Sequence, residues 1–290
     1  ILNSLKSKVN EIEKQKKIIH IFNSKYILDK KNIDNLPIGL FGNFYSQELS
    51  FFLIERNDYN NLKNIFDKCS LKITKIISKN FLEGTKIINE KPDAETFFKI
   101  DIGENIIDIS FFENSALKFS QKFKFGTNLI LNDISKIIAL DRKTVKNILK
   151  NSNLSENNTE NDFVEKNFFE NLNFRKIKKK LLYDVARARI QELAEIIILK
   201  NINLKIYLKK NLLIYLCIND SFSLNCLQKI YLFEFSKQNE FKVNSINSLS
   251  VEEIYQSANN LVQYGWKKEA VPIIQEKKSF IARFFDPIFN

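Results

Sequence analysis

The 290-residue sequence contains no methionine, and a chain without an initiator methionine is expected to lack its natural start. Its three cysteines, Cys69, Cys217 and Cys226, show no CxxC spacing and no metal-ligand spacing. A sparse, odd count of this kind is typical of a reduced cytosolic protein. The only histidine is His20, and a lone histidine most often has a structural role. We therefore expect neither a metal site nor a disulfide framework.

Long hydrophobic runs are also absent. The best candidate, residues 204–218, is interrupted by Lys209 and Lys210, whereas a membrane-spanning helix needs about 18 apolar residues in succession. The first residues are polar and rich in lysine, without the pattern of a signal peptide. These absences predict a cytoplasmic protein that contacts a membrane, if at all, only at its surface.

Arginine is scarce, with six among the 45 basic residues that give the chain a net charge of +11. Nucleic-acid readers favour arginine because its guanidinium forms bidentate contacts with bases and phosphates. The longest basic run covers only residues 178–180. The scattered lysines therefore indicate a solvated surface, and no nucleic-acid partner is expected. A basic nucleic-acid-binding module remains an alternative.

Strand-like and helix-like segments alternate along the chain, which predicts a mixed α/β (α+β) fold with two domains or two lobes. Alternating apolar residues predict the strands, and apolar residues at helical spacing predict the helices. The polar residues 151–171 are expected to form a loop. The expected strands are residues 17–29, 71–77, 98–102, 106–112, 117–125 and 212–218, and the expected helices are residues 57–69, 132–149, 174–199, 224–235 and 251–264.

Residues 99–112 form the most informative string. A strand ends in Asp101, Ile102 and Gly103, a turn follows, and Asp108 opens a second strand. This arrangement resembles the second phosphate loop of actin-like ATPases, in which glycine lets backbone N–H groups approach phosphate oxygens and the aspartate organises a metal-bound water. A strand-turn-strand with one glycine is common, so the string alone leaves an ordinary hairpin equally open.

Four flanking segments resemble the FtsA family, a group of actin-like bacterial cell-division proteins. They are residues 20–42, with a His, a Tyr, an Asp and a Pro-hydrophobic-Gly-x-x-Gly turn; residues 126–134, a glycine turn before an Asp-Ile helix start; residues 182–193, an arginine-containing helix; and residues 255–265, a last domain helix. Together with the phosphate-loop string, five matches occur in the family's order over nearly the whole chain. The resemblance is therefore specific.

The resemblance implies an actin-like ATPase fold of the FtsA type, with a 1C subdomain and without the first strands of subdomain 1A. The implied subdomains follow the family's order along the chain. They are residues 1–66 for 1C, 67–96 for the end of 1A, 97–125 and 205–265 for 2A, 126–204 for 2B, and 266–290 for a linker and a C-terminal amphipathic membrane-targeting helix.

ATP and magnesium are implied by the resemblance only, because the nucleotide site looks eroded. Glu104 and Asn105 stand where the family has glycines. A carboxylate about 5 Å from a phosphate charge costs roughly 3 kcal/mol at an effective dielectric constant of about 20. We therefore expect no catalytic residue and no enzyme activity, with an actin-like ATPase that retains ATP binding as the alternative. The eroded positions are Asp101, Gly103, Glu104, Asn105, Asp108, Lys146 and Asn219.

The resemblance also implies binding partners. In the family, subdomain 2B receives the C-terminal tail of FtsZ, and the family's two arginines match Arg175 and Arg189, fourteen residues apart. The alternative is that Arg175 only caps a basic helix start. Self-association into filaments through 1C and contacts with downstream division proteins are further expectations. The expected function is that of an adaptor that anchors FtsZ filaments to the membrane and helps assemble the division septum.

The last residues predict a short amphipathic helix. Apolar side chains recur at helical spacing on one face, with basic residues on the other. Such a helix suits weak, reversible binding to the lipid surface of the inner membrane, which would place the protein at the cytoplasmic face at the division site. Docking on its own domain as a core helix is the alternative. The predicted membrane-binding residues are Phe280, Ile281, Arg283, Phe284, Phe285 and Ile288.

Overall fold

The computed structural model describes residues 9, 11–33, 39–152, 154–169, 174–208, 211–220, 227–237 and 241–270. The chain divides into two compact units. The first unit comprises Ile1–Lys86, Asn114–Lys118 and Glu253–Asn290, and the second comprises Ile87–Glu113 and Phe119–Glu252. The first unit is therefore assembled from three separate segments of the chain. The subdomain boundaries implied by the family resemblance remain a prediction.

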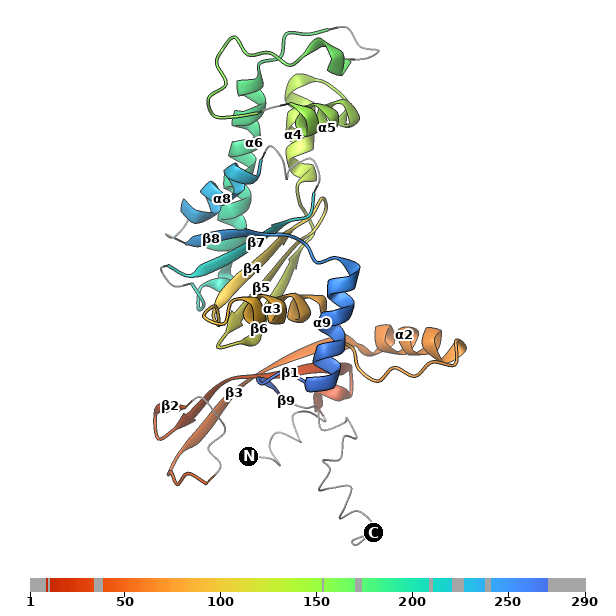
Figure 1. The fold of residues 1–290 in the computed structure, drawn as a ribbon, viewed down its shortest axis with the longest axis vertical. Coiled ribbons are helices and arrows are strands. Elements are labelled where there is room, and N and C mark those ends of the chain that lie inside the picture. The colour runs from red at the N-terminus through yellow and green to blue at the C-terminus, as the bar shows by residue number, and fades with distance from the viewer. Residues whose placement is uncertain are drawn as a thin grey trace. The chain divides into compact units, whose positions relative to one another are not determined.

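The first unit is built on an antiparallel sheet around strand β1 (Lys16–Leu28), which pairs with β2 (Lys31–Ile33), β3 (Tyr45–Glu55) and β9 (Glu269–Ala270) (Figure 1). Asp29 and Lys30 join β1 to β2, and both have positive φ. That conformation matches the right-handed twist of a tight hairpin. The two residues of β9 bring the described end of the chain back to the middle of β1.

Two helices accompany this sheet. Helix α2 (Arg56–Lys68) follows β3 directly, and α9 (Val251–Tyr264) starts at the division between the units and continues in the first. Gly265 ends α9 with a φ of +72°, and its N–H donates to the Leu261 carbonyl at 3.1 Å. Glycine is the residue that most readily adopts this left-handed conformation at the end of a helix. Both helices confirm the predicted segments.

The second unit contains a five-stranded mixed sheet in the order β6-β5-β4-β7-β8 (Figure 1). The central strand β4 runs antiparallel to β5 and parallel to β7, which is itself parallel to β8. Every residue of β4 is buried, so both faces of the strand are covered. The strands are β4 (Phe97–Ile102), β5 (Ile107–Glu113), β6 (Ala116–Phe123), β7 (Leu213–Ile218) and β8 (Lys242–Ile246).

Four helices share the main hydrophobic core of this unit with one face of the sheet. Helix α6 contacts both α4 and α8, and α4 also contacts α5. Figure 1 shows α6 running past the edge of the sheet to lie beside α4. The helices are α4 (Asn128–Ile138), α5 (Arg142–Asn151), α6 (Lys179–Ala194) and α8 (Gln228–Lys237), with short turns at Lys166–Phe169, Glu195–Leu199 and Ile202–Leu204. The two sheets and their helices confirm the mixed α/β class.

Three predicted elements differ from the structure. Residues 71–77 form no strand. Ile73 is half-buried and Thr74 is exposed, as in an alternating strand, but the segment pairs with none of the described strands. The helix expected over residues 132–149 is two helices, because Ala139 adopts a left-handed conformation and the Asp141 carboxylate caps α5. The helix expected from residue 174 begins at Lys179.

Candidate functional site

The loop after β4 holds three of the predicted nucleotide-site residues, Gly103, Glu104 and Asn105. The Gly103 N–H donates to the Ile106 carbonyl at 3.0 Å, and a Cβ at Gly103 would lie only 3.1 Å from that oxygen. The turn is therefore narrow, and glycine suits its first position.

The loop is bonded to the start of α4. The carbonyls of Gly103 and Glu104 accept the N–H groups of Thr127 and Asn128, each at 3.0 Å. Close approach is possible because residue 126 is glycine: a Cβ there would meet the Gly103 oxygen at 2.1 Å. The first N–H groups of a helix are the ones that bind phosphates. Here loop carbonyls already occupy two of these donors.

Glu104 and Lys146, both predicted as site residues, form an ion pair with 2.7 Å between Oε1 and Nζ. The hydrogen bond that Lys146 donates to Glu104 raises the pKa of Lys146, against the effect of burial, and the Asp220 carboxylate adds to the increase. The side chains are 43% and 39% exposed, respectively. The carboxylate expected to repel phosphate therefore has its own cation, supplied by α5.

A second ion pair lies inside the sheet. Lys99 and Asp101 share one face of β4, two residues apart, and the Lys99 ammonium donates to the Asp101 carboxylate. Both residues are buried, and the other Asp101 oxygen, Oδ1, is buried without a hydrogen-bond partner. Asp108 is the register partner of Asp101 on β5. Sequence analysis missed Lys99, although an opposite charge two residues from Asp101 on a strand was an available signal.

Asn219 completes the group at the carboxyl ends of the parallel strands β4 and β7. Its N–H donates to the Ile102 carbonyl at 2.8 Å, and its side-chain oxygen lies 3.2 Å from the Cys217 sulfur. The neighbouring Asp220 is buried and accepts from the Thr127 hydroxyl. The structure thus brings the seven predicted nucleotide-site residues onto the adjoining strands β4 and β5, the loop between them, the residue after β7, and α5. Their role in binding nucleotide remains a prediction.

The two predicted partner-binding arginines both reach helix α4. Arg175 is exposed, and its Nη1 lies 3.5 Å from the Ile138 carbonyl. Arg189 donates from Nε to the Asp133 carboxylate at 2.5 Å and from Nη1 to Glu192. The hydrogen bond to Asp133 raises the pKa of Arg189. Asp133 had no sequence signal, because only the fold brings α4 next to α6, whereas Glu192 lies three residues from Arg189 on the same helix, a spacing that the sequence shows.

The remaining predicted site lies outside the described residues. Residues 280–288, with the predicted membrane-binding side chains, fall in the last twenty residues, which the structure does not describe. Among the helices that it does describe, none has the length and apolar character to cross a membrane. Within the same residues, no cluster of His, Cys, Asp and Glu side chains is arranged to hold a metal ion.

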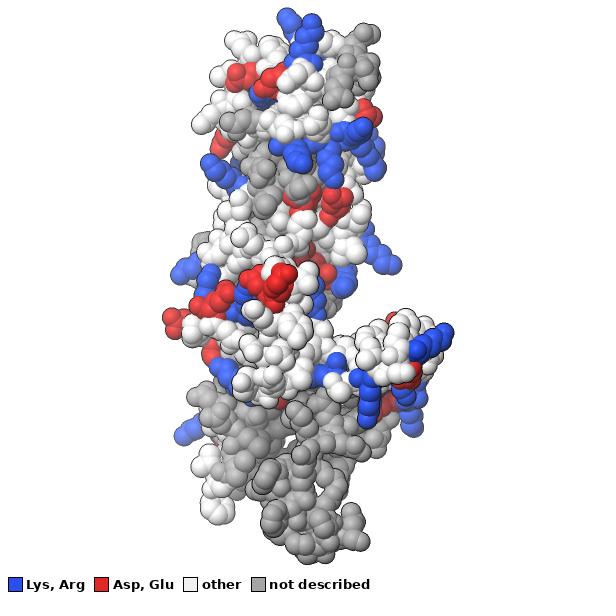
Figure 2. Space-filling model, turned by 45° about the vertical axis from the view of Figure 1, so that its right-hand side comes forward, with Lys and Arg blue, Asp and Glu red and all other residues white. Residues whose placement is uncertain are grey.

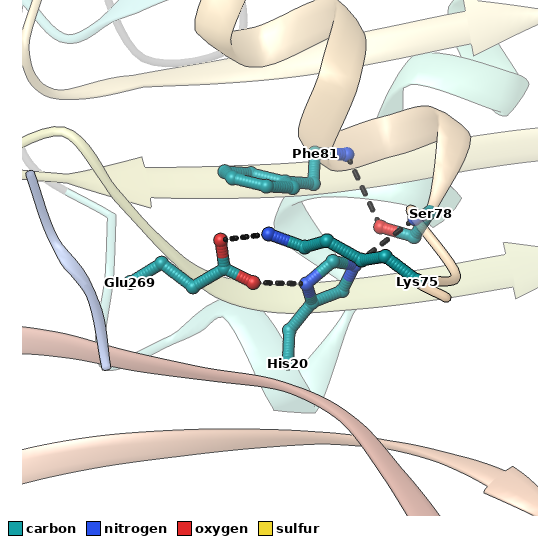
Figure 3. Close-up of polar contacts among 5 residues, drawn as sticks. All are labelled: His20, Lys75, Ser78, Phe81 and Glu269. Carbon is teal, nitrogen blue, oxygen red and sulfur yellow. Dashed lines mark hydrogen bonds and ion pairs between the residues drawn. The ribbon is translucent and has the colours of Figure 1, made fainter. Parts of the chain in front are cut away.

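The first unit contains a buried polar cluster that sequence analysis did not identify (Figure 3). Nδ1 of His20 lies 2.7 Å from Oε1 of Glu269, whose Oε2 accepts from Lys75 at 2.9 Å. The Ser78 backbone N–H donates to Nε2 of His20 at 3.0 Å. Nε2 is therefore an acceptor, so the ring proton lies on Nδ1 and is donated to Glu269. The expectation of a structural role for His20 agrees with this arrangement.

This cluster is not arranged for nucleophilic catalysis. The Ser78 hydroxyl accepts from the Phe81 N–H at 3.3 Å, as a cap for helix α3 (Lys79–Glu90), whereas His20 meets only the serine backbone (Figure 3). A serine nucleophile would need its hydroxyl on the imidazole nitrogen. The contacts instead join β1, the segment before α3 and β9, so the cluster holds the first unit together.

Charged side chains of both signs are interspersed on one face of the molecule. On the face shown in Figure 2, Lys and Arg lie among Asp and Glu and are separated by uncharged residues. Several of the lysines pair with carboxylates, as Lys178 does with Glu160 and Lys16 with Glu55. Such a pattern is the one expected of a solvated surface rather than of a continuous basic groove.

Comparisons with known proteins give sequence relatives that share one name. The chain is 24% identical to cell division protein FtsA of Buchnera aphidicola subsp. Acyrthosiphon pisum over 290 residues, which cover 94% of this chain and 68% of that protein. It is 23% identical to FtsA of Neisseria meningitidis serogroup B over 66% of this chain and 47% of that protein. No protein-family profile matches the chain.

Among solved structures, MreB5 of Spiroplasma citri bound to AMPPNP is similar, with a TM-score of 0.47 and 16% sequence identity. The similarity covers 72% of this chain and 65% of the MreB5 chain. The sequence relatives, rather than this partial structural overlap, are the basis of the assignment that follows.

Proposed function

Because the chain is a homologue of the FtsA cell-division proteins, we propose that it is a cell-division adaptor that anchors FtsZ filaments to the cytoplasmic membrane and helps assemble the septum. The observation that carries this proposal is the similarity to FtsA over 94% of the chain. The chain spans about two thirds of that relative, so the adaptor role is proposed for the protein to which these residues belong.

Binding of the acidic C-terminal tail of FtsZ is assigned to Arg175 and Arg189. Both side chains contact α4, at Ile138 and at Asp133. Charge-assisted hydrogen bonds from arginine to carboxylates are among the strongest polar contacts between proteins. Apolar side chains are exposed close by in the sequence, namely Ile137 beside Ile138 and Phe174 beside Arg175. This combination suits a peptide with both acidic and apolar residues.

The adaptor acts by binding, with no ATP turnover. Loop carbonyls occupy the Thr127 and Asn128 N–H groups, and the Glu104 carboxylate stands in the loop beside them. A phosphate would have to displace the loop carbonyls and compete with the Glu104 carboxylate for the Lys146 ammonium, so we expect an ATP affinity weaker than millimolar. The alternative, an ATPase that retains nucleotide, requires this loop to open. Calorimetric titration with Mg-ATP distinguishes the two, and micromolar binding would favour the alternative.

The membrane contact is assigned to the amphipathic segment at residues 279–290, and self-association to the 1C subdomain implied for residues 1–66. A short amphipathic segment binds lipid weakly as a monomer and firmly when many copies are linked in a filament. This would place the protein at the cytoplasmic face of the membrane at the division site, where downstream division proteins join it. Flotation with anionic liposomes tests the assignment: removal of residues 279–290 should abolish binding without lowering the melting temperature.

The central experiment reverses both arginines, Arg175→Glu and Arg189→Glu, and measures binding of a fluorescent FtsZ tail peptide by anisotropy. We expect binding to be lost while the far-ultraviolet circular dichroism stays unchanged. A matched control, Lys122→Glu with Lys200→Glu, makes the same change in net charge at two exposed lysines. It should retain most of the affinity. Equal binding by the parent and the arginine variant would remove the partner assignment.

A further inference from the structure

The two arginines proposed to bind the acidic tail differ in the contacts that they already make within the protein. Arg175 is exposed and makes one long hydrogen bond, 3.5 Å, to a backbone carbonyl. Arg189 is only 27% exposed, and its guanidinium donates to two carboxylates, those of Asp133 and Glu192. The charge of Arg175 is therefore open to an incoming carboxylate, whereas the charge of Arg189 is already neutralised.

The two carboxylates on Arg189 are not equivalent. Asp133 comes from the neighbouring helix α4, is 24% exposed, and accepts from Nε. Glu192 comes from the same helix as Arg189, one turn further on, is 48% exposed, and accepts from Nη1. An exposed ion pair within one helix contributes little to stability. Displacing Glu192 from Arg189 therefore costs little free energy, while Asp133 keeps the guanidinium oriented.

We propose that Glu192 is an intramolecular competitor for the acidic ligand at Arg189, so that this arginine binds a carboxylate only after Glu192 is displaced. The inference rests on the proposed function of this surface. With both carboxylates in place, the surroundings of Arg189 carry one more negative than positive charge and repel an acidic peptide. Once Glu192 moves away, Nη1 is released as a donor, and an external carboxylate takes the place of the internal one.

This arrangement selects the kind of peptide that binds. A first carboxylate meets the open Arg175, and the second is then held close enough to displace Glu192. Both arginines contact the same helix, α4, at Asp133 and at Ile138. A peptide with two acidic residues therefore fits better than one with a single acidic residue.

The test is Glu192→Gln, which keeps the size of the side chain and removes its charge. We expect the acidic tail peptide to bind two- to fivefold more tightly, with no change in melting temperature. The matched control is Glu195→Gln, one turn on, where the carboxylate pairs with Lys200 and not with Arg189. The control removes the same charge. Its change in log Kd for the peptide should be less than half of the change caused by Glu192→Gln.

The outcomes separate this inference from the proposed function. If Glu192→Gln binds the peptide no more tightly than Glu195→Gln, while reversal of both arginines abolishes binding, the competitor role is wrong and the partner surface stands. If reversal of both arginines leaves binding unchanged, the partner surface is wrong, and the competitor role falls with it. If Glu192→Gln increases the affinity for a peptide with two acidic residues more than for a peptide with one, the result would support this selection between peptides.

Discussion

Each unit of the molecule contains ion pairs that join distant parts of the chain, and their surroundings differ. In the first unit, the Glu269 carboxylate is 4% exposed and serves both His20 and Lys75. In the second unit, Glu104 and Lys146 pair in partial contact with solvent. Water compensates a broken exposed pair, but it cannot reach a buried one. Similar ion pairs therefore contribute differently to the free energy of unfolding.

The contrast indicates what each cluster is for. A buried charge that loses its partner costs several kcal/mol, whereas an exposed pair contributes about 0–1 kcal/mol. The first cluster is consequently a structural requirement of its unit. The second cluster balances the charge of Glu104 in the loop after β4, and its loss leaves the fold in place.

The largest effect is expected for Glu269→Gln. The glutamine amide carries no charge to balance Lys75, and only its oxygen can accept the hydrogen bond from His20. The free energy of unfolding of the first unit should therefore fall by about 3 kcal/mol. Trp266 is the only tryptophan of the chain and donates to the Ser115 carbonyl within the same unit. The fluorescence of this residue during urea titration therefore reports from the first unit. A loss below about 1 kcal/mol would mean that the cluster is not structural.

A smaller, pH-dependent effect follows from the same carboxyl group. Burial raises the pKa of Glu269, but hydrogen bonds from His20 and Lys75 outweigh burial, so the pKa lies below its ordinary value of 4.5. A depressed pKa stabilises the folded state above pH 4.5, and this contribution is lost as the pH falls through the folded-state value. The gap in stability between the parent and Glu269→Gln should therefore narrow below pH 4.5. A gap that is constant from pH 7 to pH 3 would contradict this.

The smallest effect is expected for Glu104→Gln in the second unit. Because both partners of the pair contact solvent, its loss should change the free energy of unfolding by less than about 1 kcal/mol. Far-ultraviolet circular dichroism during urea titration includes the signal of this unit, which contains α4, α5, α6 and α8. A loss as large as that for Glu269→Gln would show that exposure does not explain the contrast between the two clusters.

Local patterns predicted the central elements of the fold. The strands β4, β5 and β7 lie within about one residue of their predicted bounds, because alternating apolar residues identify a sheet without reference to its neighbours. The break at Ala139 escaped prediction, since a left-handed alanine has no sequence signal. The Asp141 cap that follows, with Thr144 three residues further on, was a sequence signal from which the end of the first helix could have been predicted.

The candidate sites were less accessible to sequence analysis. The positions around Asp101 and the two arginines came from a family resemblance, and the structure adds the partners that determine what they can bind. Glu269 lies 249 residues from His20, and Asp133 lies on a different helix from Arg189. No local periodicity couples residues at such separations. Contacts that neutralise or release a charge become visible only once the helices and strands are packed.

The discontinuous first unit has a consequence for biosynthesis. Strand β1 leaves the ribosome early, but its partner β9 follows about 240 residues later, or roughly 12–50 s at typical rates of synthesis. During that interval His20 lacks Glu269, while the second unit, apart from a hairpin, is a continuous insert that is complete at residue 252. Within these residues, the first unit is therefore the one whose segments are synthesised over the longest interval, and it can close only after the second unit has left the ribosome.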